Sequence, residues 1–127
     1  MTNSDLPYQK GLAVAVSLLS RKWQVPMLIA LIPGRRRFTE LVVAVNEDTG
    51  AGLSEKVATG TLKQMMADGV IARSGSDIRF EAVWYELTDL GRSLLEAVRP
   101  LADWAQQYPQ ALAEVGSRRP NGRTVST

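Results

Sequence analysis

The chain contains neither cysteine nor histidine, which limits the chemistry that its side chains can do. Their absence excludes thiolate nucleophiles, disulfides, Ser-His arrangements and zinc sites of the usual kind. No pair of carboxylates stands at a spacing typical of general acid–base catalysis, and no glycine-rich phosphate loop occurs. We therefore expect no enzyme, no cofactor and no metal.

Basic and hydroxyl side chains carry the chemistry that remains. The densest basic run is Arg35-Arg36-Arg37, and Lys56 and Lys63 recur farther along the chain. Guanidinium and ammonium groups neutralise phosphates or contact guanine, whereas Ser and Thr hydroxyls contact phosphates or base edges. The candidate nucleic-acid contacts are Arg35, Arg36, Arg37, Ser54, Lys56, Thr59, Lys63 and Arg79. The alternative is that these side chains only form a water-exposed surface and contact no nucleic acid.

The overall charge does not decide between these alternatives. Of 127 residues, 15 are Lys or Arg and 13 are Asp or Glu. Arg118, Arg119 and Arg123 lie in a C-terminal tail without acids, so residues 1–116 carry a net charge of −1. Nucleic-acid binding must therefore depend on local clusters.

The length and composition predict one globular domain. We expect a flexible N-terminus over 1–9, a domain over 10–115 and a disordered basic tail over 116–127. No apolar run approaches membrane-spanning length and no basic secretion signal begins the chain, so we expect no membrane contact and a cytoplasmic protein.

Apolar spacing and cap residues predict the elements that position the basic side chains. Helices are expected over 12–19, 21–32, 38–45, 55–68 and 89–108, a loop over 46–52, and strands over 70–73 and 78–87. Ser20, Ser54 and Thr88 are expected to cap the second, fourth and fifth helices. The fold class is thus mainly α with a small β-hairpin (α+β), in the order of a winged helix-turn-helix.

The last predicted helix has a wider apolar face than one domain of this size requires. We expect Leu94, Leu101, Trp104 and Tyr108 to lie in a dimer interface formed by the terminal helices.

Five short stretches resemble the HxlR-type winged-helix regulators, which share the architecture of the MarR group. They are Arg21-Lys-Trp23, Arg37-Phe-Thr-Glu-Leu41, Ser54-Glu-Lys-Val57, Asp68-Gly-Val-Ile71 and Tyr85-Glu-Leu-Thr-Asp-Leu-Gly91. The resemblance extends over about residues 10–108 and implies a homodimeric transcription regulator whose fourth helix enters the major groove.

Three positions depart from the pattern of that family. Lys10 stands where members often have a sensing cysteine, and the loop between the third and fourth helices is several residues longer. The fourth helix has Gly60-Thr61 where the family commonly has Gln-Arg, so its strongest base reader is missing.

The three tryptophans, Trp23, Trp84 and Trp104, are candidates for holding a flat ligand. Trp23 and Trp104 also suit a core or dimer interface. The resemblance assigns Tyr85 and Leu87 to the core, which places Trp84 on the opposite, exposed side of its strand.

The expected function is a repressor that binds double-stranded DNA as a homodimer at a pseudo-palindromic operator. A small apolar or aromatic effector would act without a cysteine. The alternative is a ligand- or protein-binding module, for example for drug sensing or sequestration, that kept the scaffold while its DNA readout weakened.

Overall fold

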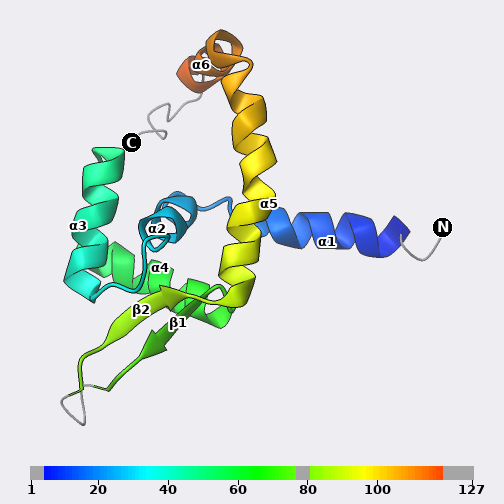
Figure 1. Ribbon diagram of the computed structural model, residues 1–127. Helices are drawn as coiled ribbons and strands as arrows, with labels where there is room; N and C mark the ends of the chain where they lie inside the picture. Colours follow the sequence, from blue (N-terminus) through cyan, green and yellow to red (C-terminus); the bar gives the residue numbers. More distant parts are fainter. Residues whose placement is uncertain (1–4, 77–80, 119–127) are drawn as a thin grey trace.

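A computed structural model describes residues 5–76 and 81–118 of the chain, which form six helices and one hairpin. Figure 1 shows their arrangement. The elements are α1 (Asp5–Ser17), α2 (Gln24–Ala30), α3 (Phe38–Thr49), α4 (Glu55–Ala67), β1 (Ile71–Ser74), β2 (Trp84–Leu87), α5 (Asp89–Gln106) and α6 (Pro109–Arg118). The mainly helical class with a small hairpin and the winged helix-turn-helix order are confirmed.

The core lies where α2, α3 and α4 meet the base of the hairpin. Each helix contributes apolar side chains at helical spacing, so one face of each is buried. The largest fully buried side chains are Met27, Leu28, Leu31, Leu41, Val45, Leu62, Met65, Val70 and Ile71, with the polar Gln24. Gln24 is tolerated there because its Oε1 accepts a hydrogen bond from the Arg21 backbone N–H, at 2.9 Å.

The connection between α3 and α4 is shorter and better fixed than the sequence predicted. Instead of ending at Val45, α3 continues to Thr49 and terminates at Gly50, whose φ of 69° is left-handed. Asn46 then bridges the turn: its Oδ1 accepts from the Leu53 N–H at 2.7 Å, and its Nδ2 donates to the Leu53 carbonyl at 3.2 Å. The expected loop over 46–52 is therefore mostly helix.

The wing is an antiparallel hairpin in which Ile71 pairs with Leu87 and Ser74 with Trp84. The second strand starts at Trp84 rather than at Ile78, and Ile78 lies outside the described residues. Arg36 forms an isolated β-bridge to this hairpin, because its N–H and carbonyl both bond to the backbone of Tyr85, at 2.9 and 2.8 Å. The wing is thereby joined to the segment that precedes α3.

The hairpin leads directly into α5, whose start is held against the core. The Thr88 side chain accepts from the Gly91 N–H at 3.0 Å, which confirms the expected cap, and donates to the Gly69 carbonyl at 2.6 Å. Gly91 is required here, since a Cβ would collide with the carbonyl oxygen of Val70. The first turn of α5 is thus fixed to the loop before β1.

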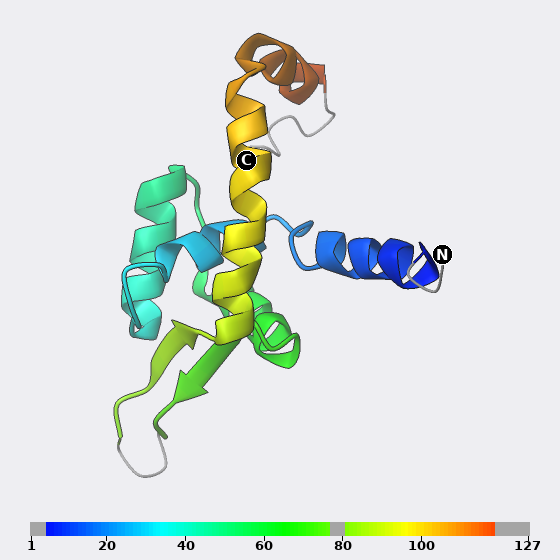
Figure 2. The same cartoon turned by 45° about the vertical axis from the view of Figure 1, so that its right-hand side comes forward.

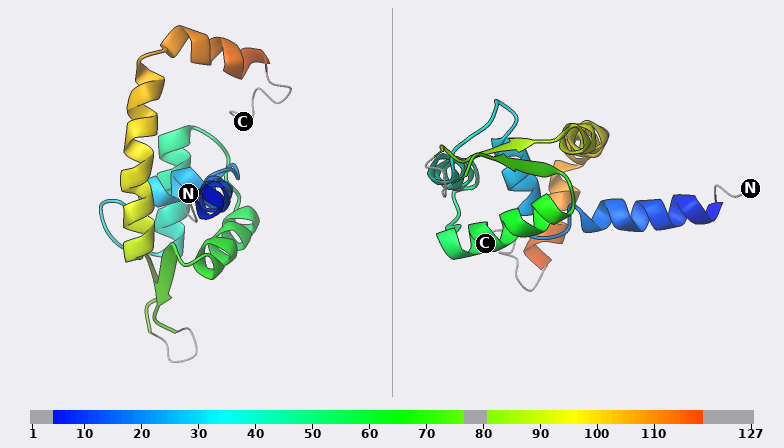
Figure 3. Two further views of the ribbon diagram at one scale, coloured as in Figure 1. Left: turned by 90° about the vertical axis from the view of Figure 1, so that its right-hand side faces the viewer. Right: turned by 90° about the horizontal axis from the view of Figure 1, so that it is seen from below.

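The two ends of the chain extend from this body. Beyond its first turns, α5 continues away from the core and meets α6, which the sequence analysis did not predict (Figure 2). Pro109 breaks α5 and begins α6, as proline is favoured at the first helical position. At the other end, α1 starts at Asp5, inside the segment expected to be flexible, and points away from the body (Figure 3).

No helix in the described part of the chain is both long enough and apolar enough to cross a membrane.

Candidate nucleic-acid interface

The helix α4 presents one face to the core and the other to solvent. Ala58, Leu62 and Met65 are buried at positions four and three residues apart, whereas Lys56, Thr59 and Lys63 are exposed. Ser54 caps the helix, with its Oγ accepting from the Val57 N–H at 3.2 Å. The structure thus places the predicted contact residues of this helix together on one solvent-facing surface.

The apolar residues of α4 predict one buried stripe made of Val57, Ala58, Leu62, Met65 and Met66. Val57 departs from this prediction, because 45% of its surface is exposed. The buried positions start at Ala58, and the residue before it is turned about 100° away around the helix axis. The spacing of Ala58, Leu62 and Met65 is the signal that could have placed Val57 on the outer face.

The described residues give no packing reason for a glycine at position 60. A Cβ built on it meets nothing within 4 Å, and the residue lies in the helix interior on the exposed face. Glycine there is about 1 kcal/mol less favourable than alanine. Residues 5–76 and 81–118 supply no packing reason for this loss of helix stability.

The three consecutive arginines differ in their surroundings. Arg36 is half-buried and its Nε donates to the Ala30 carbonyl at 2.6 Å, so this side chain helps hold α2 to the wing. Arg35 and Arg37 are exposed and lie over Trp84, with guanidinium carbons 4.2 and 5.4 Å from the ring centroid. The Arg37 backbone N–H also donates to Glu40 Oε1 at 2.8 Å and so caps α3.

Trp84 is therefore not the exposed indole that the sequence analysis predicted. It is half-buried, and two guanidinium groups lie against it. The assignment of its neighbours is confirmed, because Leu87 is buried and Tyr85 packs against the core. The alternation of side chains along the strand predicted the face on which Trp84 lies. It did not predict that Arg35 and Arg37 cover that face.

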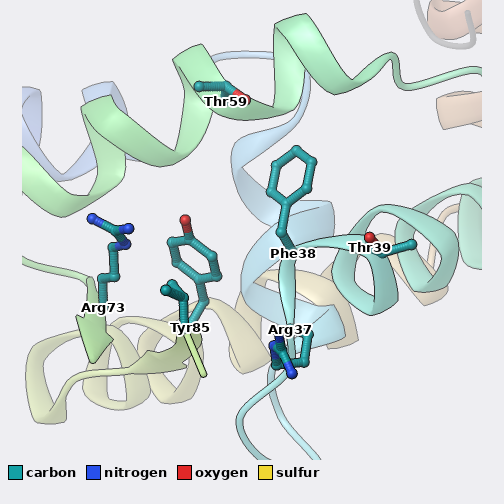
Figure 4. A pocket seen from close by; sticks show the side chains of 7 residues that line it. Arg37, Phe38, Thr39, Thr59, Arg73 and Tyr85 are labelled. Carbon is teal, nitrogen blue, oxygen red and sulfur yellow. The ribbon is translucent and has the colours of Figure 1, made fainter. Parts of the chain in front are cut away.

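A cleft of about 320 Å³ separates α4 from the wing, and Figure 4 shows it. Side chains of three elements meet there: Thr59 comes from α4, Arg37, Phe38 and Thr39 from the start of α3, and Arg73, Val83 and Tyr85 from the wing. In Figure 4 the guanidinium of Arg73 and the hydroxyl of Tyr85 both point toward α4. Arg73 and Thr39 were not among the predicted contacts. The pairing of Arg73 with Tyr85 across the hairpin brings Arg73 into this cleft.

Arg79, the predicted wing contact, lies outside the described residues.

The other predicted residues lie away from this cleft. Trp23 and Leu94 pack against the core, and the Lys22 ammonium lies 5.0 Å from the Trp23 ring centroid. Trp104 is 49% exposed and contacts Tyr108, with ring centroids 5.6 Å apart. The three tryptophans thus have separate surroundings, on α2, β2 and α5, and the structure does not bring them together as one ligand site.

A second, apolar cleft of about 520 Å³ lies between α1 and α5. Its lining residues are Gly11, Val14, Ala15, Leu18, Asp68, Leu90, Ser93, Leu94 and Ala97. The outer sides of both helices are also apolar, since Leu12, Val16, Leu101 and Trp104 are exposed. The apolar surface of α5 was predicted from the sequence, but no individual residue of α1 was assigned to it.

The arrangement of α3, α4 and the wing defines the chain as a DNA-binding transcriptional regulator of the winged helix-turn-helix class. The family described as HxlR-like helix-turn-helix matches residues 18–113, and the chain belongs to this family. The resemblance seen in the sequence is thus confirmed.

Individual relatives agree with this assignment. The chain is 31% identical to YvaP of Bacillus subtilis, an HTH-type transcriptional regulator, over 74% of this chain and 82% of that protein. A solved MarR-family transcriptional regulator from Enterococcus faecalis V583 superposes with a TM-score of 0.70 at 28% identity, covering 84% of this chain and 92% of that one. Quinone-bound YodB from B. subtilis superposes with a TM-score of 0.62 at 26% identity, covering 77% and 97% of the two chains.

Proposed function

We propose that this chain is a homodimeric repressor that binds a pseudo-palindromic operator in double-stranded DNA, with α4 of each protomer in the major groove. The observation that carries the proposal is the exposed surface of α4, where Lys56, Thr59 and Lys63 lie side by side beyond the Ser54 cap. Two such helices in a symmetric dimer would enter major grooves about 34 Å apart.

The hydroxyl groups of α4 are suited to different contacts. Thr59 Oγ1 donates its proton to the Glu55 carbonyl at 2.9 Å, so its remaining capacity is to accept a hydrogen bond. It therefore suits the amino group of a cytosine or an adenine. Ser54 Oγ accepts from Val57 N–H and keeps its proton to donate, which suits a phosphate oxygen.

The remaining contacts follow from charge and shape. Lys56 and Lys63 are assigned to phosphates or guanine, and the exposed methyl groups of Val57 to a thymine methyl. Arg35 and Arg37 are assigned to the phosphate backbone, together with Arg73 in the cleft. Arg36 has a structural role in this scheme. Arg79 keeps its predicted contact with the minor groove or its phosphates.

The apolar surfaces of α1 and α5 support dimerisation. Helix α1 exposes Tyr8, Leu12, Val14 and Val16 on several sides, and a helix that is apolar all round is normally buried. Leu101, Trp104 and Tyr108 continue this surface along α5. A second copy of the chain would cover both helices and bury the predicted interface residues.

The cleft between α1 and α5 is our candidate site for an apolar or aromatic effector. Its lining is almost wholly apolar, and it adjoins the proposed dimer interface, so occupancy would change the spacing of the two α4 helices. The quinone bound to YodB is a small flat ring and supports a ligand of that shape. Any such ligand must act in a cysteine-independent manner, since the sequence contains no thiol.

Selection of genomic DNA fragments with the purified protein, followed by a salt titration of the best binder, tests the proposal. We expect selective binding whose log affinity falls linearly with log salt concentration, by about 0.9 per phosphate neutralised. A reporter gene joined to the selected fragment should be silenced when the protein is expressed. Weak, unselective retention of DNA would instead favour the ligand- or protein-binding module.

A further inference from the structure

The segment before α3 and the strand β2 form an arrangement in which the proposed function gives no role to Trp84. Arg36 pairs with Tyr85 through two backbone hydrogen bonds, and successive side chains of a strand alternate between its faces. Arg35 and Arg37 therefore share one face of this small sheet, and Trp84 lies on the same face.

Two positive charges meet on one indole there. The Arg35 guanidinium carbon lies 4.2 Å from the ring centroid and that of Arg37 lies 5.4 Å away, both within the range of a cation–π interaction. The indole attracts both guanidinium groups, and an anion bound by the two would offset the repulsion between them.

The described part of the chain provides no carboxylate for either guanidinium. Glu86 lies on the same face of β2, two residues from Trp84, yet it makes no ion pair with Arg35 or Arg37 among the described residues. Glu40 accepts a hydrogen bond from the backbone of Arg37. The guanidinium N–H groups of Arg35 and Arg37 thus remain available to donate hydrogen bonds to an external acceptor.

We propose that Arg35, Arg37 and Trp84 form a phosphate clamp for the DNA backbone, in which Trp84 is a positioning residue. A guanidinium stacked on an indole has its plane fixed, and its N–H edge points outward in the geometry that matches a phosphate bidentately. Fixing the two side chains in advance reduces the rotamer entropy that binding would otherwise remove. This inference rests on the proposed function.

The position of the clamp agrees with its ligand. It lies on β2 beside the start of α3, and Arg37 also lines the cleft that faces α4 (Figures 1 and 4). Trp84 lies on the face of β2 opposite Tyr85, whose hydroxyl points toward α4, so the clamp would meet the backbone of a duplex that extends past α4 around the wing. The ligand is therefore a pair of backbone phosphates on duplex DNA.

Substitutions of Trp84 test the clamp, with random-sequence duplex DNA as the probe and fluorescence anisotropy as the measurement. Trp84→Leu keeps apolar volume but removes the aromatic face, and should weaken binding about five- to thirtyfold and reduce the salt slope. Trp84→Phe keeps an aromatic face and should remain within about threefold of the unaltered chain. Thermal unfolding of both variants checks that they fold.

A double-mutant comparison separates positioning from a general effect on the fold. In a chain that already carries Arg35→Ala and Arg37→Ala, Trp84→Leu should cause no further loss of affinity, because the indole acts only through these arginines. An additive loss would overturn the clamp, as would Trp84→Leu binding like the unaltered chain; the proposed function would survive both results. Absence of duplex binding by the unaltered chain would overturn the proposed function and the clamp together.

Discussion

At the residue scale, the lysines of α4 distinguish two interpretations of this helix. Either they contact DNA phosphates, or they only lie on a water-exposed surface. Lys56 and Lys63 are both exposed, and they lie on the face of α4 that is proposed to meet DNA. Each lysine that contacts a phosphate releases condensed counterions on binding, whereas a solvated lysine releases none. The salt dependence of binding therefore distinguishes the two roles.

We expect Lys56→Ala and Lys63→Ala to weaken operator binding and to flatten the salt dependence. A dimer loses two phosphate contacts per substitution, which reduces the slope of log affinity against log salt by about 1.8. Arg118→Ala is the matched control, because it removes a positive charge at the end of α6, far from α4 in Figure 1. If both lysine variants bind like this control, the assignment of α4 contacts is wrong.

Asn46 acts at the same scale, through the turn that presents α4. Its amide closes the connection by bonding to both backbone groups of Leu53. Removing the amide leaves a buried backbone donor and acceptor unsatisfied, which costs about 1–3 kcal/mol. Asn46→Ala should lower the free energy of unfolding by this amount in a denaturant titration.

Asn46→Asp provides the matched comparison for this contact. The carboxylate still accepts from the Leu53 N–H but no longer donates to the Leu53 carbonyl, so its loss of stability should be smaller. Equal stability of Asn46→Ala and the unaltered chain would show that the turn does not depend on this side chain.

At the element scale, Gly60 decides how closely another molecule can approach α4. No residue in the described part of the chain lies within 4 Å of a Cβ built at this position, and glycine weakens the helix. A close approach of the DNA to the helix backbone is a physical reason for keeping it. Stability and binding should then respond to a substitution in opposite directions.

Gly60→Ala should raise the free energy of unfolding by about 1 kcal/mol and weaken operator binding, because the added methyl group lies between α4 and the DNA. Gly116→Ala is the control, since it also lies within a helix with open space around it, but in α6. It should stabilise the chain without changing DNA affinity. Unweakened operator binding by Gly60→Ala would exclude a close approach at this position.

At the scale of the whole molecule, α1 and α5 lie on the opposite side from α3 (Figure 3). Their exposed apolar residues would be buried only by a second copy of the chain in the proposed assembly. Operator affinity should depend on this assembly, because a dimer binds its two half-sites together. Sedimentation measures the assembly directly.

Leu101→Glu should convert the dimer to monomers in sedimentation velocity and weaken operator binding at least tenfold, since it places a charge in an apolar interface. Val43→Glu is the control: it introduces the same charge at an exposed valine of α3, on the opposite side. This variant should remain dimeric. A dimeric Leu101→Glu protein would locate the interface elsewhere.

The sequence by itself determined the features that depend on neighbouring residues. Apolar spacing predicted the helices that became α3, α4 and α5, and hydroxyl residues before helices identified the caps at Ser54 and Thr88. The cap expected at Ser20 was wrong, because α2 begins at Gln24 and follows Trp23 without a side-chain cap. The other predictions succeed because helical periodicity and capping act over three or four residues. The exposed surface with Lys56, Thr59 and Lys63 follows from the same spacing.

Only the tertiary structure decided the features that join distant segments. It separated Arg36, which bonds to Ala30 and Tyr85, from Arg35 and Arg37, which cover Trp84. It also showed Asn46 closing the turn to α4. Three adjacent arginines look alike in sequence, and their roles diverge because a strand alternates its faces and β2 reaches them from almost fifty residues away.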